Sequence, residues 1–272
     1  MDVIAAHGAR IPVLGFGTMT LKEDQCVELV EAALQLGYRH LDTAQMYGNE
    51  REVGAGLRGS GLRREDVFIT TKVWFNRLAL GDFERSVDES LEKLGLPWVD
   101  LLMIHWPNAQ VPLAESIASL CKVKKEGLAK HIGVANFNIA MIEEATALAS
   151  EPIAVLQIEA HPYLDQRKVI AAARRHDMAI VGYCPLARGK VPGDETLLRI
   201  GRAHGKTASQ VALRFLEQHG IIPIPRTSKR ERLAENLGSL DFMLSDVEMA
   251  EIDKLRRPDG RIVSPPQAPQ WD

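Results

Sequence analysis

Four side chains near the ends of short apolar segments are of the types that could give a proton to a carbonyl oxygen: Asp42, Tyr47, Lys72 and His105. A tyrosine has an ordinary pKa of about 10, and an adjacent ammonium group lowers that pKa because it favours the phenolate. We expect Lys72 to act on Tyr47 in this way, with Asp42 holding Lys72 charged and in place. His105 would orient the carbonyl and stabilise its developing negative charge.

This set supplies an acid and a clamp for oxygen, but none of its members attacks the carbonyl carbon. Another group must therefore supply the nucleophile. A hydride from a nicotinamide is the natural candidate for that role.

The elements that would position these side chains follow from an alternation of short apolar segments with longer segments of helical period. Several of the short segments are apolar almost throughout, as in parallel strands buried on both faces. The eight predicted strands are residues 14–18, 40–44, 67–72, 99–105, 131–136, 155–160, 179–185 and 221–226. Helices are predicted at 24–36, 82–95, 113–126, 138–149, 165–176 and 207–219. This repeat predicts an α/β fold, a closed (β/α)8 TIM barrel whose active site lies at the carboxyl ends of its strands.

The two ends of the chain differ from this repeat. Residues 2–13 have Gly8 between two short apolar segments, which predicts a β-hairpin that caps one end of the barrel. Residues 245–256 predict an extra helix, opened by Ser245 with Glu248 three residues later. Asp82 and Asp165 stand where helix N-caps are expected. Since no linker rich in Pro, Gly or Ser divides the chain, we expect residues 1–272 to form a single domain.

Composition excludes several classes of protein. The formal net charge of −3 gives no reason to expect a nucleic acid as a partner. No apolar segment approaches the roughly 20 residues needed to span a bilayer, and the first residues do not resemble a signal peptide. Three widely spaced cysteines predict neither a disulfide framework nor a structural zinc site, and they fit a reducing cytoplasm. We expect no metal site.

Three short motifs are expected to be structural. The GAGLRG segment at 54–59 has the spacing of a dinucleotide-binding loop, but it follows a helix-like stretch and not a strand. The GRAHGKT segment at 201–207 is one residue too short for a phosphate-binding loop. Glu159 and His161 have no third ligand near them in the sequence, so a polar pair at a strand end is favoured over a metal site.

Longer segments resemble the aldo-keto reductase family over essentially the whole chain. GYRHLDTAQMYGNEREVG at 37–54 is similar to the first signature of that family. Further family segments follow in the right order: LLMIHWP (101–107), IGVANF (132–137), QIEAHPYL (157–164) and IPRTSKRERLAENL (224–237). The tail GRIVSPPQAPQWD (260–272) resembles that of the bacterial 2,5-diketo-D-gluconate reductases.

The resemblance implies a role for each matching residue. Asp42, Tyr47, Lys72 and His105 would fill the catalytic tetrad of the family. Asn136 and Gln157 would bind the nicotinamide carboxamide, and Tyr183 would stack on the ring. Other cofactor contacts would come from Gly17, Thr18, Met19 and Leu186. The chain departs from the family pattern at three positions, where Ala135, Cys184 and Ala187 replace more usual Ser, Ser and Gly residues.

The loop after the last predicted strand predicts which nicotinamide cofactor is used. Four cations lie within residues 226–232, and alone they would be read as a solvated face. Barrels often bind phosphate at this position, where amide groups and a helix dipole favour anions. With the family resemblance, a site for the 2′-phosphate of NADPH/NADP+ is favoured, formed by Arg226, Thr227, Ser228, Arg232 and Asn236.

A short segment after His105 predicts an open pocket, which we expect Trp74, His105, Trp106 and the tail to line. Such a pocket suits small polar carbonyl compounds, such as keto-sugar acids including 2,5-diketo-D-gluconate, methylglyoxal and short aldehydes. We expect a monomer. Two alternatives remain open: a Schiff-base aldolase that uses Lys72 as nucleophile, and a non-enzymatic barrel that senses NADPH. An Asp42 partner disfavours the first, since that role needs a neutral lysine. A complete tetrad disfavours the second.

Overall fold

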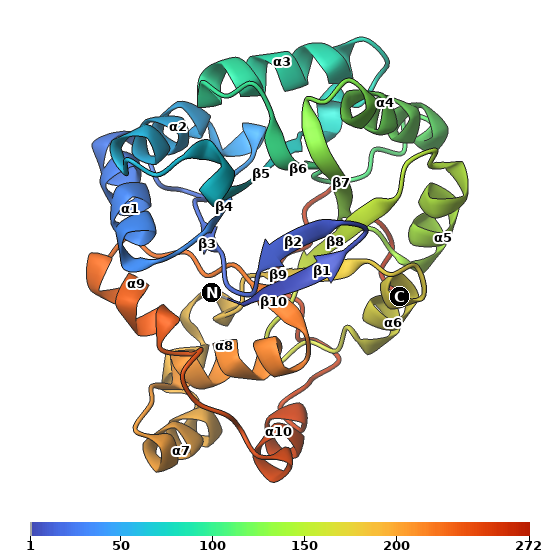
Figure 1. The fold of residues 1–272 in the computed structure, drawn as a ribbon. Helices are drawn as coiled ribbons and strands as arrows, with labels where there is room; N and C mark the ends of the chain where they lie inside the picture. Colours follow the sequence, from blue (N-terminus) through green and yellow to red (C-terminus); the bar gives the residue numbers. More distant parts are fainter. Residues whose placement is uncertain (1) are drawn as a thin grey trace.

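A sheet of eight parallel strands forms the centre of the molecule in the computed structural model, which describes residues 2–272 (Figure 1). Each strand is hydrogen-bonded to the next along the chain. The strands are β3 (Phe16–Gly17), β4 (His40–Asp42), β5 (Phe68–Val73), β6 (Val99–Ile104), β7 (Ala129–Ala135), β8 (Ile153–Glu159), β9 (Ala179–Tyr183) and β10 (Ile221–Pro223). Every predicted strand is therefore confirmed, although β3, β4 and β10 are shorter than the apolar segments that predicted them.

Backbone hydrogen bonds at the two edge strands close this sheet into a barrel. Gly15 N–H donates to the Pro223 carbonyl at 3.0 Å, and Gly17 N–H donates to the Pro225 carbonyl at 3.1 Å. A side chain at Gly17 would come within 2.9 Å of the Ile224 carbonyl, so glycine permits this close approach. The predicted (β/α)8 barrel is confirmed.

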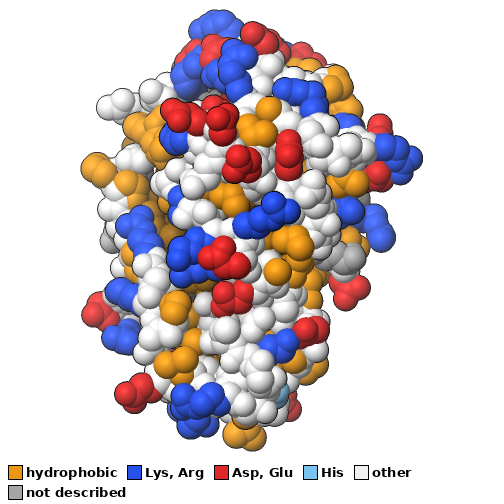
Figure 2. All heavy atoms as spheres, turned by 90° about the vertical axis from the view of Figure 1, so that its left-hand side faces the viewer, with side chains coloured by type: hydrophobic (Ala, Val, Ile, Leu, Met, Phe, Trp, Pro, Cys, Tyr) orange, Lys and Arg blue, Asp and Glu red, His pale blue; other side chains and the backbone are white. Residues whose placement is uncertain are grey.

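Helices surround the barrel, one or more after each strand (Figure 1). They are α1 (Glu23–Leu36), α2 (Glu50–Gly59), α3 (Asp82–Leu94), α4 (Leu113–Lys125), α5 (Ile139–Leu148), α6 (Arg167–Arg175), α7 (Glu195–His204), α8 (Ala208–Gln218), α9 (Arg230–Leu237) and α10 (Asp246–Asp253). The extra helix predicted at 245–256 is α10, and Ser245 and Glu248 form the expected capping box. On the side of α1 and α2, basic and acidic side chains are interspersed (Figure 2).

Two predicted helix caps are one residue away from their expected places. The N-cap of α3 is Gly81, and Asp82 is the first helical residue. The N-cap of α6 is Gln166, although the Asp165 carboxylate accepts the Arg167 N–H at 3.1 Å. In α3 the Glu84 carboxylate reaches back to the Gly81 N–H at 2.9 Å, so the cap is made from inside the helix.

The predicted N-terminal hairpin closes one end of the barrel. Strands β1 (Val3–Ala6) and β2 (Ala9–Pro12) pair antiparallel, with His7 and Gly8 both at positive φ in the turn. Its buried side chains join the apolar interior of the barrel, which includes Leu101, Val155 and Ile222. A separate, larger apolar cluster fills the space between the strands and the surrounding helices. The end of the barrel opposite the hairpin is therefore the one left for polar side chains.

The short motifs have structural roles. Gly54 and Gly56 lie inside α2, where a side chain would come within 2.0 Å of the Leu94 carbonyl and 2.7 Å of Val30 respectively. Gly201 lies inside α7 and packs on the Lys206 carbonyl in the same way. None of the helices among residues 2–272 combines the length and apolar character needed to cross a membrane.

Candidate active site

The carboxyl ends of neighbouring strands bring the predicted reactive side chains to one end of the barrel. Asp42 is the last residue of β4, Lys72 is the next-to-last residue of β5, and His105 directly follows β6. Gln157 lies in β8, and Tyr183 is the last residue of β9. Since these strands are all parallel, their carboxyl ends meet at the same end of the barrel.

A buried ion pair forms the floor of this site. The Lys72 ammonium donates to Asp42 Oδ1, and it also donates to the Thr43 carbonyl at 2.9 Å. The side chains of Lys72 and Asp42 are 0% and 1% exposed, so neither charge is solvated. Gln157 Nε2 donates to Asp42 Oδ2 at 2.8 Å, which gives the second carboxylate oxygen a partner as well. Burying two charges is costly unless both are paired and hydrogen-bonded, and here both are.

Tyr47 lies beside the floor, at the end of a short 3-10 turn, η1 (Gln45–Tyr47). The Lys72 Nζ atom is 5.1 Å from the centre of the Tyr47 ring. The His105 ring meets the Tyr47 ring edge-on, with 5.7 Å between centroids. Gly48, at φ +62°, ends the turn, and the Gln45 side chain ties it to the Ser86 carbonyl at 2.8 Å. The structure thus brings all four predicted reactive side chains together.

The electrostatics differ from the expected lowering of the Tyr47 pKa. Desolvation raises the pKa of Tyr47 well above its ordinary value, and the Asp42 carboxylate raises it further. The expectation was wrong because burial of the phenol is the largest effect on this pKa, and the Asp42 carboxylate acts in the same direction. Burial also lowers the pKa of Lys72, which Asp42 opposes. Burial, helped by Lys72, holds the pKa of His105 well below its ordinary value. The phenol is therefore protonated and the imidazole neutral at neutral pH.

Two of the three residues expected at the nicotinamide, Asn136 and Tyr183, are hydrogen-bonded to each other, and the third, Gln157, binds Asp42. The Tyr183 hydroxyl donates to Asn136 Oδ1 at 2.7 Å, and Asn136 Nδ2 donates to the His105 carbonyl at 3.0 Å. Asn136 has φ +62°, a conformation that asparagine tolerates better than most residues. Ala135 is fully buried. Cys184 and Ala187, which depart from the family pattern, both have positive φ in the loop that follows β9 and contains Leu186.

The loop after β10 presents the predicted phosphate-binding residues at the same end of the barrel. Arg226, Ser228 and Arg232 are exposed, whereas Thr227 and Asn236 are buried. Arg226 Nε donates to the Met19 carbonyl at 3.1 Å, which links this loop to the segment that follows Gly17 at the end of β3 and contains Thr18. No side chain caps the start of α9. Among residues 2–272, none of Arg226, Lys229, Arg230 and Arg232 forms an ion pair, so unpaired cations and free helix amides lie together, which fits a phosphate.

Three tryptophan rings lie around the tetrad. The Trp74 ring meets the His105 ring edge-on, with 5.0 Å between centroids. Trp106, the residue after His105, meets Trp271 of the C-terminal tail with 6.1 Å between centroids. The expected wall of Trp74, Trp106 and the tail is therefore assembled from three parts of the chain.

Sequence reasoning missed the polar side chains that brace the tetrad. Asn49 Nδ2 donates to the Thr18 carbonyl at 2.8 Å, and Asn49 Oδ1 accepts the Thr43 hydroxyl at 2.8 Å. The Thr18 hydroxyl donates to the Asp42 carbonyl at 3.0 Å. The available signal was the polar segment directly after Tyr47, since a buried loop must pair its polar groups.

The Glu159–His161 pair occurs as expected, with 2.8 Å between Glu159 Oε1 and His161 Nε2. Within residues 2–272, no group of three or more His, Cys, Asp and Glu side chains is placed to hold a metal ion.

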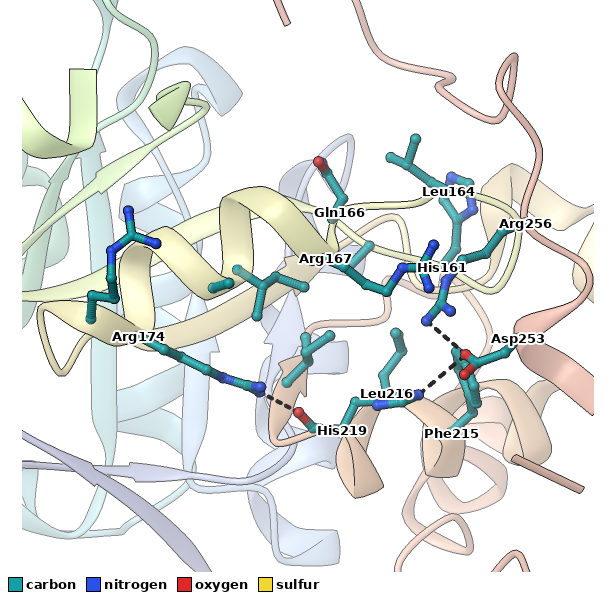
Figure 3. A pocket seen from close by; sticks show the side chains of 15 residues that line it. His161, Leu164, Gln166, Arg167, Arg174, Phe215, Leu216, His219, Asp253 and Arg256 are labelled. Atoms are coloured by element: carbon teal, nitrogen blue, oxygen red, sulfur yellow. Dashed lines mark hydrogen bonds and ion pairs between the residues drawn. The ribbon is translucent and has the colours of Figure 1, made fainter. Parts of the chain in front are cut away.

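A cavity of about 510 Å³ lies away from the tetrad, between α6 and α8 on the outside of the barrel (Figure 3). Its floor is apolar, and arginines stand around it. Most of these cations already have acidic partners: Arg256 lies 2.7 Å from Asp253, and Arg175 lies 2.7 Å from Glu143. His161 lines this cavity (Figure 3), and the same imidazole binds Glu159.

Comparisons with known proteins agree with this geometry. The model of the Aldo/keto reductase family matches residues 13–257. A methylglyoxal reductase, DkgB, from Escherichia coli O157:H7 is 43% identical over 96% of this chain and 99% of its own. A glyoxal reductase from Bacillus subtilis (strain 168) is 35% identical over 94% of this chain and 93% of its own.

Solved structures agree as well. A crystal structure provisionally named as a 2,5-diketo-D-gluconic acid reductase B is 49% identical, covers 100% of this chain and 98% of its own, and superposes with a TM-score of 0.98. The aldose reductase from Schistosoma japonicum is 32% identical over 95% of this chain and 94% of its own, with a TM-score of 0.91. The chain therefore belongs to the aldo/keto reductase family, and it is an oxidoreductase that acts on carbonyl groups.

Proposed function

We propose that this protein reduces small polar aldehydes and ketones to alcohols with NADPH, and that Tyr47 is the proton donor. The observation that carries the proposal is the stack formed by the buried Lys72–Asp42 pair, the Tyr47 ring 5.1 Å from the Lys72 ammonium, and the His105 ring against Tyr47. An acid, a cation and an imidazole then surround the position of one carbonyl oxygen.

The residues present fit the cofactor at two places. Asn136, Gln157 and Tyr183 would hold the nicotinamide end, since Gln157 Oε1 accepts no hydrogen bond within residues 2–272 and can take one from a carboxamide. The unpaired cations and helix amides after β10 would hold the 2′-phosphate, with Arg226, Thr227, Ser228, Arg232 and Asn236 as the contacts. Gly17, Thr18, Met19 and Leu186 would line the path between them. When bound, NADPH supplies the hydride that reduces the carbonyl carbon.

Side chains of the protein supply the proton and stabilise the charges that form during its transfer. Tyr47 holds its proton at neutral pH because its pKa is raised, and it gives that proton to the carbonyl oxygen as alkoxide character develops there, because an alkoxide is the stronger base. Lys72 stabilises the phenolate that forms, and Asp42 keeps Lys72 in place. The neutral His105 imidazole donates a hydrogen bond that orients the carbonyl.

The substrate class follows from the wall of tryptophans and from the relatives. Two curated relatives are named for methylglyoxal and glyoxal, and one solved relative for 2,5-diketo-D-gluconic acid, all of which carry neighbouring carbonyl and oxygen groups. We therefore propose dicarbonyl compounds and keto-sugar acids as substrates. An aldolase is disfavoured because Asp42 opposes the lowering of the Lys72 pKa by burial and so favours the charged amine.

We further propose that residues 1–272 act as a single-domain monomer in the cytoplasm. The three cysteines are all free, which suits a reducing compartment.

A kinetic screen tests the proposed function. Purified protein is mixed with methylglyoxal, glyoxal, 2,5-diketo-D-gluconate and a simple alkyl aldehyde, with NADPH or NADH, and the loss of reduced-nicotinamide absorbance is followed. We expect turnover of the dicarbonyl compounds, with NADPH preferred over NADH. No turnover of any carbonyl with either cofactor would contradict the proposal.

A further inference from the structure

The C-terminal tail, residues 258–272, returns from α10 to the candidate active site. Arg257 N–H donates to the Tyr163 carbonyl at 3.0 Å, where the tail begins. Gly260 lies against the same carbonyl, so closely that a side chain would come within 2.0 Å of its oxygen. Glycine at this position lets the tail lie flat on the segment after β8, so the backbone enters the site at a fixed place.

Glu159, the last residue of β8, binds two consecutive backbone amides of the tail. Its Oε1 atom accepts the Ile262 N–H at 2.7 Å, and its Oε2 atom accepts the Val263 N–H at 2.8 Å. Its side chain is fully buried. A carboxylate has two acceptor oxygens and no donor, so it is suited to holding two consecutive backbone amides.

His161 completes the set of donors to Glu159. Tyr163 N–H donates to His161 Nδ1 at 3.3 Å, so that nitrogen carries the lone pair and Nε2 carries the hydrogen. His161 Nε2 therefore donates to Glu159 Oε1 at 2.8 Å. Glu159 therefore accepts three N–H groups, two on Oε1 and one on Oε2.

After the two amides that Glu159 binds, the tail reaches the tryptophan wall of the candidate active site. The Arg261 guanidinium lies 3.6 Å from the centre of the Trp271 ring, and Trp271 Nε1 donates to the Ser264 hydroxyl at 3.2 Å. Trp271 in turn meets Trp106, the residue after His105. Trp271 is therefore contacted by Arg261 and Ser264, which flank the two residues whose amides Glu159 binds. The end of the tail has a second anchor at the start of α5, where Asn138 Nδ2 donates to the Gln270 carbonyl at 3.0 Å and Ile139 N–H donates to Asp272 Oδ2 at 2.8 Å.

We propose that Glu159 is a positioning residue for substrate binding, which acts by fixing the C-terminal tail so that Trp271 forms one wall of the carbonyl pocket. The inference rests on the proposed function. The same strand supports both parts of the site, because Gln157, two residues earlier, holds Asp42. β8 thus aligns the substrate wall with the proton donor.

Glu159→Gln is the direct test, because it keeps the size of the side chain but turns one acceptor oxygen into a donor. That donor would face a backbone N–H, and one hydrogen bond to a charged acceptor would be lost. We expect the KM for 2,5-diketo-D-gluconate to rise about tenfold, as for the loss of one charge-assisted hydrogen bond. We expect kcat and the KM for NADPH to change little, because the tetrad and the cofactor residues are untouched.

A second readout follows the tail itself. Trypsin should cleave after Arg261 faster in Glu159→Gln than in the unchanged protein, because the following amides are released. This measurement needs no turnover, so it remains informative if no carbonyl substrate is found. Failure of the proposed function would then leave the tail result standing, and an unchanged cleavage rate would overturn the tail proposal alone.

Glu159→Gln changes a buried residue and could misfold. Val263→Pro is a second test, because it alters the tail and not the barrel. Proline removes the amide hydrogen that Glu159 Oε2 accepts and leaves the barrel as it is. We expect it to reproduce the rise in KM and the faster cleavage. Both changes break the contact between Glu159 and the tail. The double variant should therefore have nearly the same KM and cleavage rate as either single variant.

Glu143→Gln is the matched control. Glu143 also accepts hydrogen bonds from a histidine and an arginine, His176 and Arg175, both at 2.7 Å, but it lies in α5 and does not touch the tail. Its KM and cleavage rate should be those of the unchanged protein. Fully additive effects of Glu159→Gln and Val263→Pro, or an equal loss of kcat and NADPH binding in Glu159→Gln, would show a general structural role and overturn the proposal.

Discussion

The floor and the rim of the site hold their charges in opposite ways. In the floor, Lys72 and Asp42 are buried, and each charge is matched by the other and by neutral partners. At the rim after β10, Arg226 and Arg232 are exposed and form no ion pair within residues 2–272. The charges of the floor are paired within the protein, whereas these two cations of the rim have no acidic partner among the described residues. Under the proposed function, this difference means that the reactive groups are preorganised in the barrel and that the choice of cofactor depends on the loop after β10.

The largest expected effect lies at the floor, on Tyr47. Tyr47→Phe removes the proton donor and keeps the ring between Lys72 and His105. Turnover should fall by about 10²- to 10⁴-fold, the usual contribution of general acid catalysis. Stopped-flow or steady-state kinetics with methylglyoxal measure the loss of turnover. Fluorescence titration should show unchanged NADPH binding. Turnover within a few-fold of the unchanged protein would remove Tyr47 from the mechanism.

Lys72→Met should affect both activity and stability, because it leaves the Asp42 charge buried without its partner. We expect a loss of about 3–5 kcal/mol in the free energy of unfolding, measured by urea denaturation. Adding Asp42→Asn removes the stranded charge and should restore most of that stability but not the turnover. If the double variant regained turnover, the ion pair would be structural and not part of the chemistry.

Arg232→Ala tests the rim. It should raise the KM for NADPH about tenfold, as expected for one lost charge-assisted contact, and leave the KM for NADH nearly unchanged. Glu231→Ala, the neighbouring residue on α9, serves as control and should not raise the KM for NADPH. Equal rises in the KM for NADPH and for NADH in Arg232→Ala would argue against a 2′-phosphate site at the rim.

A smaller effect is expected in the pH dependence of stability, through His40. Burial lowers the pKa of His40 from 6.5 to about 4. The unfolded chain therefore binds a proton below pH 6.5 that the folded chain does not bind until about pH 4. The free energy of unfolding should fall as the pH falls through this window, by about 1.4 kcal/mol per pH unit from this residue. His40→Gln should flatten the slope in denaturation curves between these pH values, and an unchanged slope would assign it to other groups.

Much of the fold could be predicted from the sequence, because its signals are local. Apolar segments such as 99–105 and helical periods such as 113–126 lie within single elements, and each matches a strand or helix to within a few residues. The candidate tetrad could be predicted because Asp42, Lys72 and His105 stand at or just after strand ends, and Tyr47 lies in the loop that follows β4. The direction of the Tyr47 pKa shift could not be predicted, because it depends on burial of the phenol and on the approach of the Asp42 carboxylate.

The sequence by itself determined the strand–helix alternation, the hairpin, the last helix and the residue types that stand at the strand ends, since these depend on neighbours along the chain. Only the tertiary structure decided which distant groups meet. Glu159 binds amides about one hundred positions later in the chain, and Trp271 meets Trp106 across the mouth of the site. Such contacts are set by barrel closure and by the return of the tail, and their energies depend on burial that no local pattern carries.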